Sequence, residues 1–540
     1  MDVSWDFIVV GAGSAGCVLA NRLSADPNNR VLLLEAGPKD RNPWIHVPVG
    51  YYKTMHSELS WGYDTEPEPE LDGRRIHWPR GKVLGGSSSI NGLVYIRGQQ
   101  EDYEHWRQLG NTGWGWDDVL PYFKRAEHNE RGADAWRGTG GPLKVSDIRD
   151  RREICDAFIA SANAAGVPPN ADFNGAVQEG AGYFQTTSVG GLRCSSAVGY
   201  LKPARSRANL HIQTDALATE LVFDGDRISG VRYIQSGVDR LANCQGEVVL
   251  CGGAVNSPQL LQLSGIGPGA HLRELGIEVR KDLPSVGQDL QDHLQIRSLY
   301  RLNKPISVND EVNNLLRRAW TGVQFAIQRR GPLTLSAGSV GVFAKVLPES
   351  ETPDIQFHFI PFSADKPGTG LHRWSGVTSS VCQLRPESRG EILITSRDPH
   401  AHPRIVGNYL STEYDKRVLI EGLRLARRIS QAMPFQGHVA EEVEPGLDLI
   451  EDAALMEHVR KRATTIFHPT STCRMGADAR AVVDPRLRVR GVAGLRIADC
   501  SIMPTIPSGN TNAPAIMVGE KCADMMLEDA KAHVVREPAA

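Results

Sequence analysis

Three glycines and one acid near the start of the chain have the types and spacing of a dinucleotide-binding site. Gly11, Gly13 and Gly16 form the pattern GxGxxG, and Glu35 follows Gly16 by 35 − 16 = 19 residues. Gly11 allows a tight turn, Gly13 lets the backbone approach a pyrophosphate, and Gly16 lets a helix pack closely on a strand. Glu35 can accept hydrogen bonds from ribose hydroxyls. The spacing therefore predicts a dinucleotide cofactor, without separating NAD from FAD.

The strands and the helix that must position these residues can also be predicted from the sequence. Residues 6–10 and 31–35 are short apolar runs typical of buried parallel strands, and residues 17–23 between them have helical character. The N-terminus of that helix would attract phosphate groups. A glycine-rich turn in some other α/β protein is the alternative, which the strand, helix and acid together disfavour. The further cofactor positions expected here are Ser14, Ala15 and Ala36.

A second glycine patch spans residues 77–92 and contains Gly85 and Gly86, followed by three serines. Such a segment can lie against a planar cofactor or a phosphate because it offers donors without bulk. A surface loop is the alternative, but Trp78 is unusual in one. The cofactor positions expected in or beside this patch are Arg80, Gly85, Gly86, Asn91, Gly92 and Val94.

A third patch, residues 252–267, follows the apolar run 247–251 and begins with Gly252, a further cofactor position. Ser257 followed by Pro258 predicts the start of a helix, with Ser257 as its N-cap. An adjacent acid and histidine, Asp292 and His293, lie a little further along.

These patches carry a resemblance. The two long glycine segments resemble the two signatures of the glucose-methanol-choline (GMC) oxidoreductases, and the match extends from about residue 6 to about residue 528. Within that family the chain is similar to bacterial FAD-dependent alcohol dehydrogenases and to choline dehydrogenases. The resemblance implies FAD rather than NAD. It also implies cofactor contacts at Trp61, Val222, Asp499, Cys500 and Thr511.

His468 lies in a segment that resembles the family's catalytic-histidine motif. A lone histidine is more often structural than catalytic, so its assignment as the general base rests on the resemblance. The family's second active-site residue is His or Asn, and counting along the motif places it at Asn512, 512 − 468 = 44 residues later. A helix cap is the alternative role for Asn512. Some family members attach FAD covalently through a histidine where this chain has Ile90, which predicts non-covalent FAD.

The order of the motifs predicts an α/β protein with a discontinuous FAD-binding domain of the Rossmann-like, glutathione-reductase type. We expect this domain to comprise residues 1–155, 196–300 and 465–540. An inserted α+β substrate domain built on an antiparallel sheet would comprise 156–195 and 301–464.

Within the insertion, residues 354–360 alternate as a half-buried strand would. Residues 376–384 and 391–395 flank a turn and predict a hairpin. Residues 415–433 predict an amphipathic helix. Residues 51–75 read either as an ordered loop over the cofactor, with Trp61 a candidate ring contact, or as a mobile surface loop.

Composition excludes several classes. The 60 Lys and Arg against 63 Asp and Glu give a formal charge of −3, which argues against a nucleic-acid binder. The longest uncharged stretch near the start, residues 7–20, is too short for a membrane span. We expect no signal peptide, because Asp2 and Asp6 stand where a basic region would lie. The nine scattered cysteines indicate reduced, cytoplasmic thiols, and no metal site is expected. The sequence does not decide whether the protein associates peripherally with the inner membrane. It does not decide the oligomeric state either. The mixed charges of 124–131 predict a solvated face.

Together these observations favour a flavin-dependent dehydrogenase that converts a primary alcohol to an aldehyde and passes electrons to a quinone or another non-oxygen acceptor. An oxidase of the same family, which would use O₂, is the main alternative. A flavin-containing lyase and an NAD-dependent dehydrogenase are the others. The sequence favours no particular alcohol, and choline is not favoured over aliphatic or benzylic alcohols.

Overall fold

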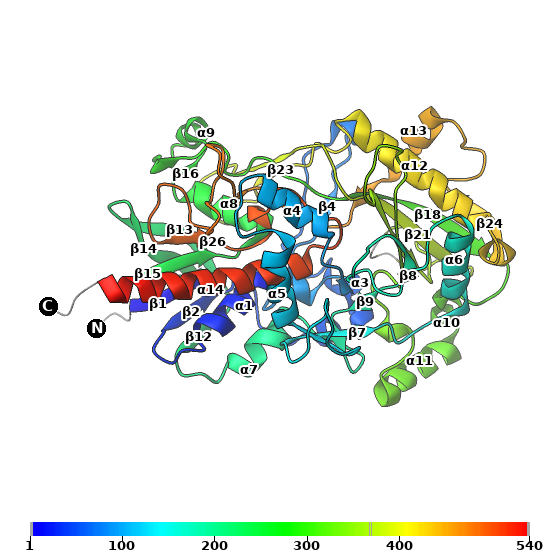
Figure 1. The fold of residues 1–540 in the computed structure, drawn as a ribbon, viewed down its shortest axis with the longest axis horizontal. Helices are drawn as coiled ribbons and strands as arrows, with labels where there is room; N and C mark the ends of the chain where they lie inside the picture. Colours follow the sequence, from blue (N-terminus) through cyan, green and yellow to red (C-terminus); the bar gives the residue numbers. More distant parts are fainter. Residues whose placement is uncertain (1–3, 367, 369, 537–540) are drawn as a thin grey trace.

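The computed structural model describes residues 4–366, 368 and 370–536. Two seven-stranded sheets lie side by side, each with its own helices (Figure 1). The first sheet has the order β12-β2-β1-β15-β14-β13, and β26 also pairs with β15. Its strands are β1 (Ser4–Val10), β2 (Val31–Leu34), β12 (Leu210–Gln213), β13 (Ala216–Asp224), β14 (Arg227–Gln235), β15 (Val238–Leu250) and β26 (Leu495–Ile497).

The parallel core of this sheet follows from the apolar runs in the sequence. In β1, the last four residues are buried, and Ile8 pairs with Leu32 of β2 on one side and Val248 of β15 on the other. Strands buried on both faces need such continuous apolar sequence. The strands β12, β2, β1, β15 and β26 run parallel, so their carboxyl ends share one edge of the sheet.

Two helices from opposite ends of the chain pack together against this sheet (Figure 1). They are α1 (Ser14–Leu23) and α14 (Asn512–Arg536). A Cβ added at Gly519 of α14 would lie 2.9 Å from the carbonyl oxygen of Ala15 in α1. Glycine is therefore needed where the two helix backbones approach closely.

The second sheet has the order β24-β18-β21-β20-β19-β8, with β25 paired to β18, and its strand pairs are antiparallel. Phe158 of α6 (Glu153–Ala164) stacks on Phe359 of β20 at a ring separation of 4.1 Å, inside the second hydrophobic core. The helix α12 (Glu413–Ser430) covers this sheet at β21. The strands are β8 (Gly180–Tyr183), β18 (Leu294–Leu302), β19 (Val340–Ala344), β20 (Ile355–Ile360), β21 (Gly376–Gln383), β24 (Val439–Glu444) and β25 (Thr464–Thr465).

Three local expectations differ from the structure. The strand β18 belongs to the second sheet, whereas the order of the motifs predicts residues up to 300 to lie in the cofactor domain. The strand β22 (Glu391–Leu393) pairs with β23 (Arg404–Val406) and not with β21, so the predicted hairpin is wrong. The helix α8 runs from Gly253 to Leu263, so it begins well before Pro258.

A side chain compensates for the proline inside α8. Proline has no N–H, which leaves the carbonyl four residues earlier without its helical donor. That carbonyl belongs to Ala254, and it accepts a hydrogen bond from Thr472 Oγ1 at 2.7 Å. The local pattern at Ser257 and Pro258 therefore misleads because a residue 214 positions beyond Pro258 (472 − 258) supplies the missing donor.

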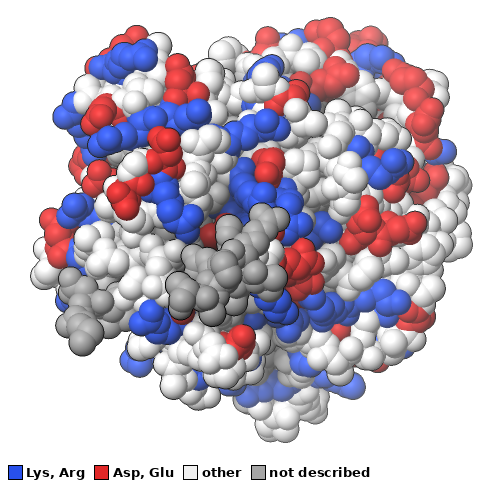
Figure 2. All heavy atoms as spheres, turned by 60° about the vertical axis from the view of Figure 1, so that its left-hand side comes forward, with Lys and Arg blue, Asp and Glu red and all other residues white. Residues whose placement is uncertain are grey.

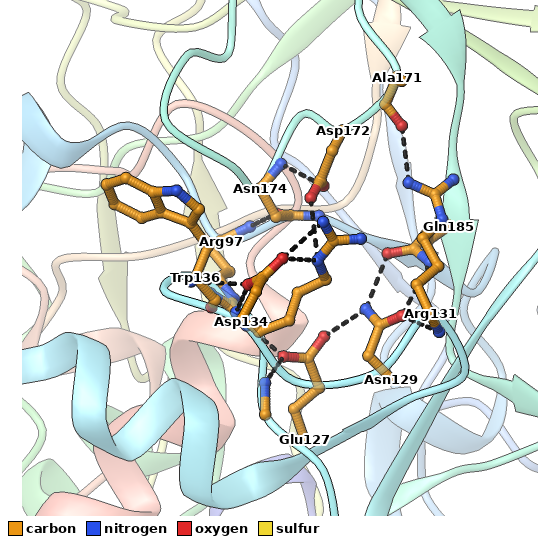
Figure 3. Close-up of polar contacts among 12 residues, drawn as sticks. Arg97, Glu127, Asn129, Arg131, Asp134, Trp136, Ala171, Asp172, Asn174 and Gln185 are labelled. Carbon is orange, nitrogen blue, oxygen red and sulfur yellow. Dashed lines mark hydrogen bonds and ion pairs between the residues drawn. The ribbon is translucent and has the colours of Figure 1, made fainter.

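The charged segment 124–131 is not simply a solvated face. Glu127 and Asn129 of β6 (Glu127–Asn129) are buried, and Glu127 forms an ion pair with the fully buried Arg97 (Figure 3). Asn129 Nδ2 donates to Glu127 at 2.7 Å and to Gln185 at 2.9 Å. Charge pattern alone missed this network because its main partner, Arg97, is distant in sequence.

The surface carries both signs of charge in a mixed pattern on the face drawn in Figure 2, consistent with the formal charge of −3. Among the described residues, no helix has the length and apolar character needed to cross a bilayer.

Candidate active site

One cavity of about 750 Å³ is lined by both halves of the molecule. Val10, Leu34 and Leu250, at the carboxyl ends of β1, β2 and β15, line it from the first sheet, whereas Gln295 and His358 line it from the second. Most positions predicted from the sequence line this cavity. They are Gly11, Gly13, Ser14, Ala15, Glu35, Ala36, Trp61, Arg80, Gly86, Asn91, Gly92, Val94, Gly252, His468, Asp499, Cys500, Thr511 and Asn512.

Three predicted cofactor positions lie outside the cavity lining. Gly16 has the packing role expected of it, since an added Cβ would lie 1.9 Å from the Gly11 oxygen. Gly85 lies behind the lining and donates its N–H to the Ala12 oxygen at 2.8 Å. Val222 pairs with Gly230 well along β13, and the residues of that region that reach the cavity are 216–218 instead. Because β13 runs away from the cavity, only its beginning can contact a ligand.

Glu35 lies at the end of the cavity formed by the first glycine turn. Its carboxylate oxygens accept the N–H groups of Ala12 and Gly37, each at 2.9 Å. Burial is the main cause that raises the pKa of Glu35 to about 7, although these two hydrogen bonds and Lys82 favour the charged form. A carboxylate in this place has the acceptor chemistry that ribose hydroxyls require.

Two helix N-termini meet at the same end of the cavity. Ser14, the first residue of α1, donates its hydroxyl to Asn512 Oδ1 of α14 at 2.8 Å. The α1 N-cap is Gly13, which has no side chain to cap the first-turn N–H groups. These N–H groups, together with the positive ends of both helices, suit an anionic group such as a pyrophosphate.

The glycine patches form a close backbone floor. A Cβ added at Gly86 would lie 2.7 Å from the Gly13 Cα, so the two patches approach too closely for side chains. Cavity size, the uncapped helix end and the buried acid together fit FAD, and Glu35, the α1 N-terminus and the glycine patches are the residues that would hold it.

A chain of three hydrogen bonds defines the state of His468. His293 Nε2 lies 3.0 Å from the Leu384 carbonyl oxygen, His293 Nδ1 lies 3.0 Å from His468 Nδ1, and Asn510 Nδ2 lies 3.2 Å from His468 Nε2. A carbonyl only accepts, so His293 donates from Nε2 and accepts at Nδ1. His468 then donates from Nδ1. Its Nε2 is left as an acceptor, a tautomer assigned from the hydrogen-bond partners.

A second contact agrees with this orientation of the Asn510 amide. Gln356 Nε2 donates to Asn510 Oδ1 at 3.2 Å, which leaves the Asn510 nitrogen facing His468, an orientation assigned from the hydrogen-bond partners. Asn510 and His468 both line the cavity. A neutral imidazole nitrogen and an amide N–H are therefore presented together to any ligand there.

Asp292 holds the backbone that carries His468. Its Oδ1 accepts the His468 N–H at 2.8 Å, and its Oδ2 accepts the Tyr409 hydroxyl at 2.5 Å and the Thr465 hydroxyl. The preceding residue, Phe467, has a φ of 69°, which is uncommon for a residue with a side chain. The buried hydrogen bonds of Asp292 stabilise this strained turn and fix the imidazole.

Burial keeps the histidines of the site neutral. Desolvation is the main cause that lowers the pKa of His468 well below its usual value. Electrostatic interactions with His293, His358 and Arg80 lower it further. Desolvation also lowers the pKa of His293 and of His358 to about 4. At neutral pH, His468 can therefore accept a proton, which is the requirement for a general base.

The structure corrects the predicted partner of His468. Asn510, and not Asn512, lies beside the imidazole, whereas Asn512 begins α14 and bonds to Ser14. The sequence contains both residues in Gly509-Asn510-Thr511-Asn512, and counting residues cannot decide which one turns toward the histidine. The difference arises because α14 begins at Asn512, which commits that side chain to the helix contact.

Sequence reasoning also missed Arg193. This buried guanidinium donates to the Ile45 oxygen at 2.7 Å, to Asn91 Oδ1 at 2.6 Å and to the Asn91 carbonyl at 2.7 Å. It therefore ties the end of the second glycine patch in place. Desolvation lowers the pKa of Arg193 to about 9. No motif marks it, whereas Asp292 and His293 stood out as an adjacent pair without a role.

Comparison with known proteins now decides the family. A GMC oxidoreductase N-terminal family profile matches residues 5–295, and the C-terminal profile matches residues 386–519. The chain belongs to the GMC oxidoreductase family.

Relatives of this GMC oxidoreductase cover almost its whole length. It is 44% identical to an alcohol dehydrogenase [acceptor] of Pseudomonas putida, over 97% of this chain and 96% of that one. It is 42% identical to the mitochondrial choline dehydrogenase of Homo sapiens, over 97% and 89%. The crystal structure of pyridoxine 4-oxidase from Mesorbium loti matches with a TM-score of 0.88 at 29% identity, over 97% and 99%. GMC oxidoreductases bind FAD, so the fit of the cavity agrees with the family.

Proposed function

We propose that this GMC oxidoreductase oxidises a primary alcohol to an aldehyde, with His468 as the general base. The observation that carries the proposal is the unprotonated Nε2 of a buried, neutral imidazole that lines the cavity beside an amide donor. FAD supplies the hydride acceptor. The protein supplies the proton acceptor, the orientation and the dry surroundings.

Two side chains handle the substrate oxygen in this proposal. In this proposal the substrate hydroxyl displaces the contact between Asn510 Nδ2 and His468 Nε2. Asn510 then donates its Nδ2–H to the hydroxyl oxygen and orients it, and His468 Nε2 takes the hydroxyl proton. After the transfer, His468 Nδ1–H still donates to His293, so the ring stays in place. The role first expected for Asn512 passes to Asn510, because Asn510 is the amide beside the base.

The charges that line the cavity favour an uncharged substrate. The acids among the described lining residues are Glu35 and Asp499. Asp499 is engaged by Ser257 at 2.6 Å and by the Gly253 N–H at 2.9 Å. By contrast, basic residues are more numerous in the lining, namely Lys53, Arg80, Arg297, Arg318 and Lys366. A quaternary ammonium ion would meet repulsion there, so aliphatic or benzylic alcohols are favoured over choline.

For the electron acceptor, we propose a quinone or another non-oxygen acceptor. The alcohol dehydrogenase of Pseudomonas putida, with its printed qualifier "acceptor", supports this choice. An alcohol oxidase that produces hydrogen peroxide is the second candidate, because formate oxidase is among the structural relatives, with a TM-score of 0.90 at 27% identity. A flavin-containing lyase is a weaker alternative.

We also propose that FAD is held without a covalent bond. Ile90 lines the cavity where a covalently linking histidine would be expected, and its side chain has no nucleophile. Acid precipitation of the yellow holoenzyme should release all flavin into the supernatant. Flavin retained on the pellet would contradict this assignment.

The decisive experiment is an anaerobic reduction of the bound flavin by a panel of alcohols, followed by addition of air. Bleaching by aliphatic or benzylic alcohols but not by choline supports the proposal. Less than one peroxide per flavin reoxidised in the presence of a quinone supports a dehydrogenase, whereas stoichiometric peroxide supports the oxidase. If no alcohol in the panel bleaches the flavin, the result would contradict the proposed oxidation and favour the lyase.

A further inference from the structure

The helix α11 (Leu315–Gln328) presents an unusually apolar face to solvent. Figure 1 shows it at the lower edge of the molecule, beside α10 (Val308–Asn313). Leu316, Trp320 and Ile327 are 83%, 61% and 77% exposed, and Leu315 and Val323 are exposed as well. Residues 316, 320, 323 and 327 have the spacing of one helix face. The opposite face holds Thr321 and Phe325, which are buried.

The charge around this face is entirely positive along the helix. Residues 315–330 contain four arginines, Arg317, Arg318, Arg329 and Arg330, and no acid. All four are exposed. The nearby acids of α10 are engaged, since Asp310 accepts from Ser375 at 2.7 Å and Glu311 pairs with Arg152 at 2.7 Å. An apolar stripe flanked by uncompensated arginines is typical of a helix that lies in the interface of an anionic membrane.

The length of α11 fits lying on a bilayer and not crossing it. It has 14 residues, fewer than the roughly 20 that a membrane-spanning helix needs. Docking of a second copy on the same face would bring two sets of four arginines together, which like-charge repulsion opposes. A contiguous apolar face of this kind marks an interaction site, and its charge selects an anionic partner.

The active-site cavity opens beside this helix. Val312 and Arg318, both exposed, are among the cavity-lining residues, and so are Thr321 and Gly322 of α11. A molecule dissolved in the outer part of a bilayer would therefore meet the cavity without crossing a large volume of water. We propose that α11 docks this protein on the surface of a bilayer containing anionic phospholipid, with the cavity opening beside the lipid. The docking goes beyond the proposed reaction and does not depend on it.

The test is cosedimentation of the FAD-loaded enzyme with vesicles at low ionic strength. Vesicles of equal parts phosphatidylglycerol and phosphatidylcholine should bind the enzyme, and vesicles of phosphatidylcholine alone should bind it at least about tenfold more weakly. The triple variant Leu316→Ser, Trp320→Ser, Ile327→Ser should lose at least about tenfold in vesicle affinity. The double variant Arg317→Gln, Arg330→Gln should lose a similar factor on anionic vesicles.

A matched control separates this face from general surface hydrophobicity. Val238, Leu447 and Ile450 are 53%, 56% and 65% exposed and lie outside α11, and their triple serine variant should bind vesicles like the wild type. All variants should keep their flavin absorbance and their turnover of a water-soluble alcohol. Absence of binding, equal binding to both vesicle types, or equal loss in the control would overturn the proposal. A dimer in sedimentation that the α11 triple variant abolishes would also overturn it.

Discussion

At the scale of single residues, the arrangement around His468 turns an ordinary histidine into a directed base. The Leu384 carbonyl sets the tautomer of His293, and His293 in turn sets that of His468. The lone pair at Nε2 is thereby fixed without any contact from the substrate. Asn510 Nδ2 lies beside this nitrogen in the cavity, whereas Asn512 accepts a hydrogen bond from Ser14.

The first prediction separates the two asparagines. His468→Ala should reduce the rate of anaerobic flavin bleaching by an alcohol at least about 100-fold, the low end for loss of a general base. Asn510→Ala should lower the same rate because it removes the oxygen-orienting donor. Asn512→Ala should instead weaken FAD retention, since Ser14 loses its partner at the α1 N-terminus. Stopped-flow absorbance measures the rates, and dialysis measures the retention. A larger rate loss for Asn512→Ala than for Asn510→Ala would restore the pairing expected from the sequence.

The second prediction concerns Glu35. Burial raises its pKa to about 7 in the protein without cofactor, so its charged form, which accepts from ribose, predominates above that pH. The dissociation constant of FAD should therefore fall as pH rises through 7. Glu35→Gln should weaken FAD binding by about tenfold and remove this pH dependence, because a neutral amide does not titrate. Fluorescence titration of the apoprotein with FAD measures both effects. A variant that keeps the wild-type pH profile would contradict the role of Glu35.

At the scale of elements, the first strand, turn and helix depend on glycines that permit backbone contact. Gly16 of α1 is the clearest case, since its added Cβ would lie 1.9 Å from the Gly11 oxygen. The contact fixes where α1 begins relative to β1, and thus where its N-terminus faces the cavity.

The third prediction follows from this contact. Gly16→Ala should lower the free energy of unfolding by about 2 kcal/mol through overpacking and should release FAD. Gly322→Ala is the control, because a Cβ there meets no atom within 4 Å in the middle of α11. That change should stabilise the protein by about 0.5 to 1 kcal/mol. Urea denaturation of both variants provides the comparison. Equal effects would show that helix propensity, and not the close contact, dominates at Gly16.

Elements could be predicted from the sequence where the residues that determine them lie close together in the chain. The GxGxxG turn, its two strands and Glu35 follow from spacing and apolar runs, and the structure has them in place. The start of α8 and the partner of His468 could not be predicted because distant residues decide them. Thr472 supplies the donor that makes Pro258 tolerable, and the α1–α14 contact commits Asn512. Arg193 and Glu127 carry no motif, and their burial follows only from the assembled fold.

At the scale of the whole molecule, the cavity between two sheets places three neutral histidines out of water. Their pKa values lie below the usual value near 6.5, so the unfolded chain binds more protons than the folded protein does when the pH falls below that value. Folding stability must then decrease as the pH falls, since protonation favours the unfolded chain. The contribution of His293 and His358 levels off below their folded values of about 4.

The fourth prediction tests this dependence. The thermal unfolding midpoint of the FAD-loaded protein should fall between pH 7 and pH 5, and His358→Gln should flatten the decline because one buried titrating group is removed. Differential scanning calorimetry measures the midpoints. An unaltered slope for His358→Gln would mean that other groups govern acid stability.

The closing strand of the first sheet has a consequence for biosynthesis. One edge of β15 pairs with β1. The other edge pairs with β14 at residues 238–243 and with β26 at residues 248–250, so residues 248–250 lack this second partner until residue 497 has been made. The helix α14, which covers α1 and meets it at the cofactor end, emerges later still. A ribosome therefore completes nearly the entire chain before the flavin can be enclosed. Chains stalled on the ribosome before residue 495 should carry no bound FAD, whereas the released full chain should acquire it, and retention of flavin by the stalled chains would show that the first 494 residues suffice.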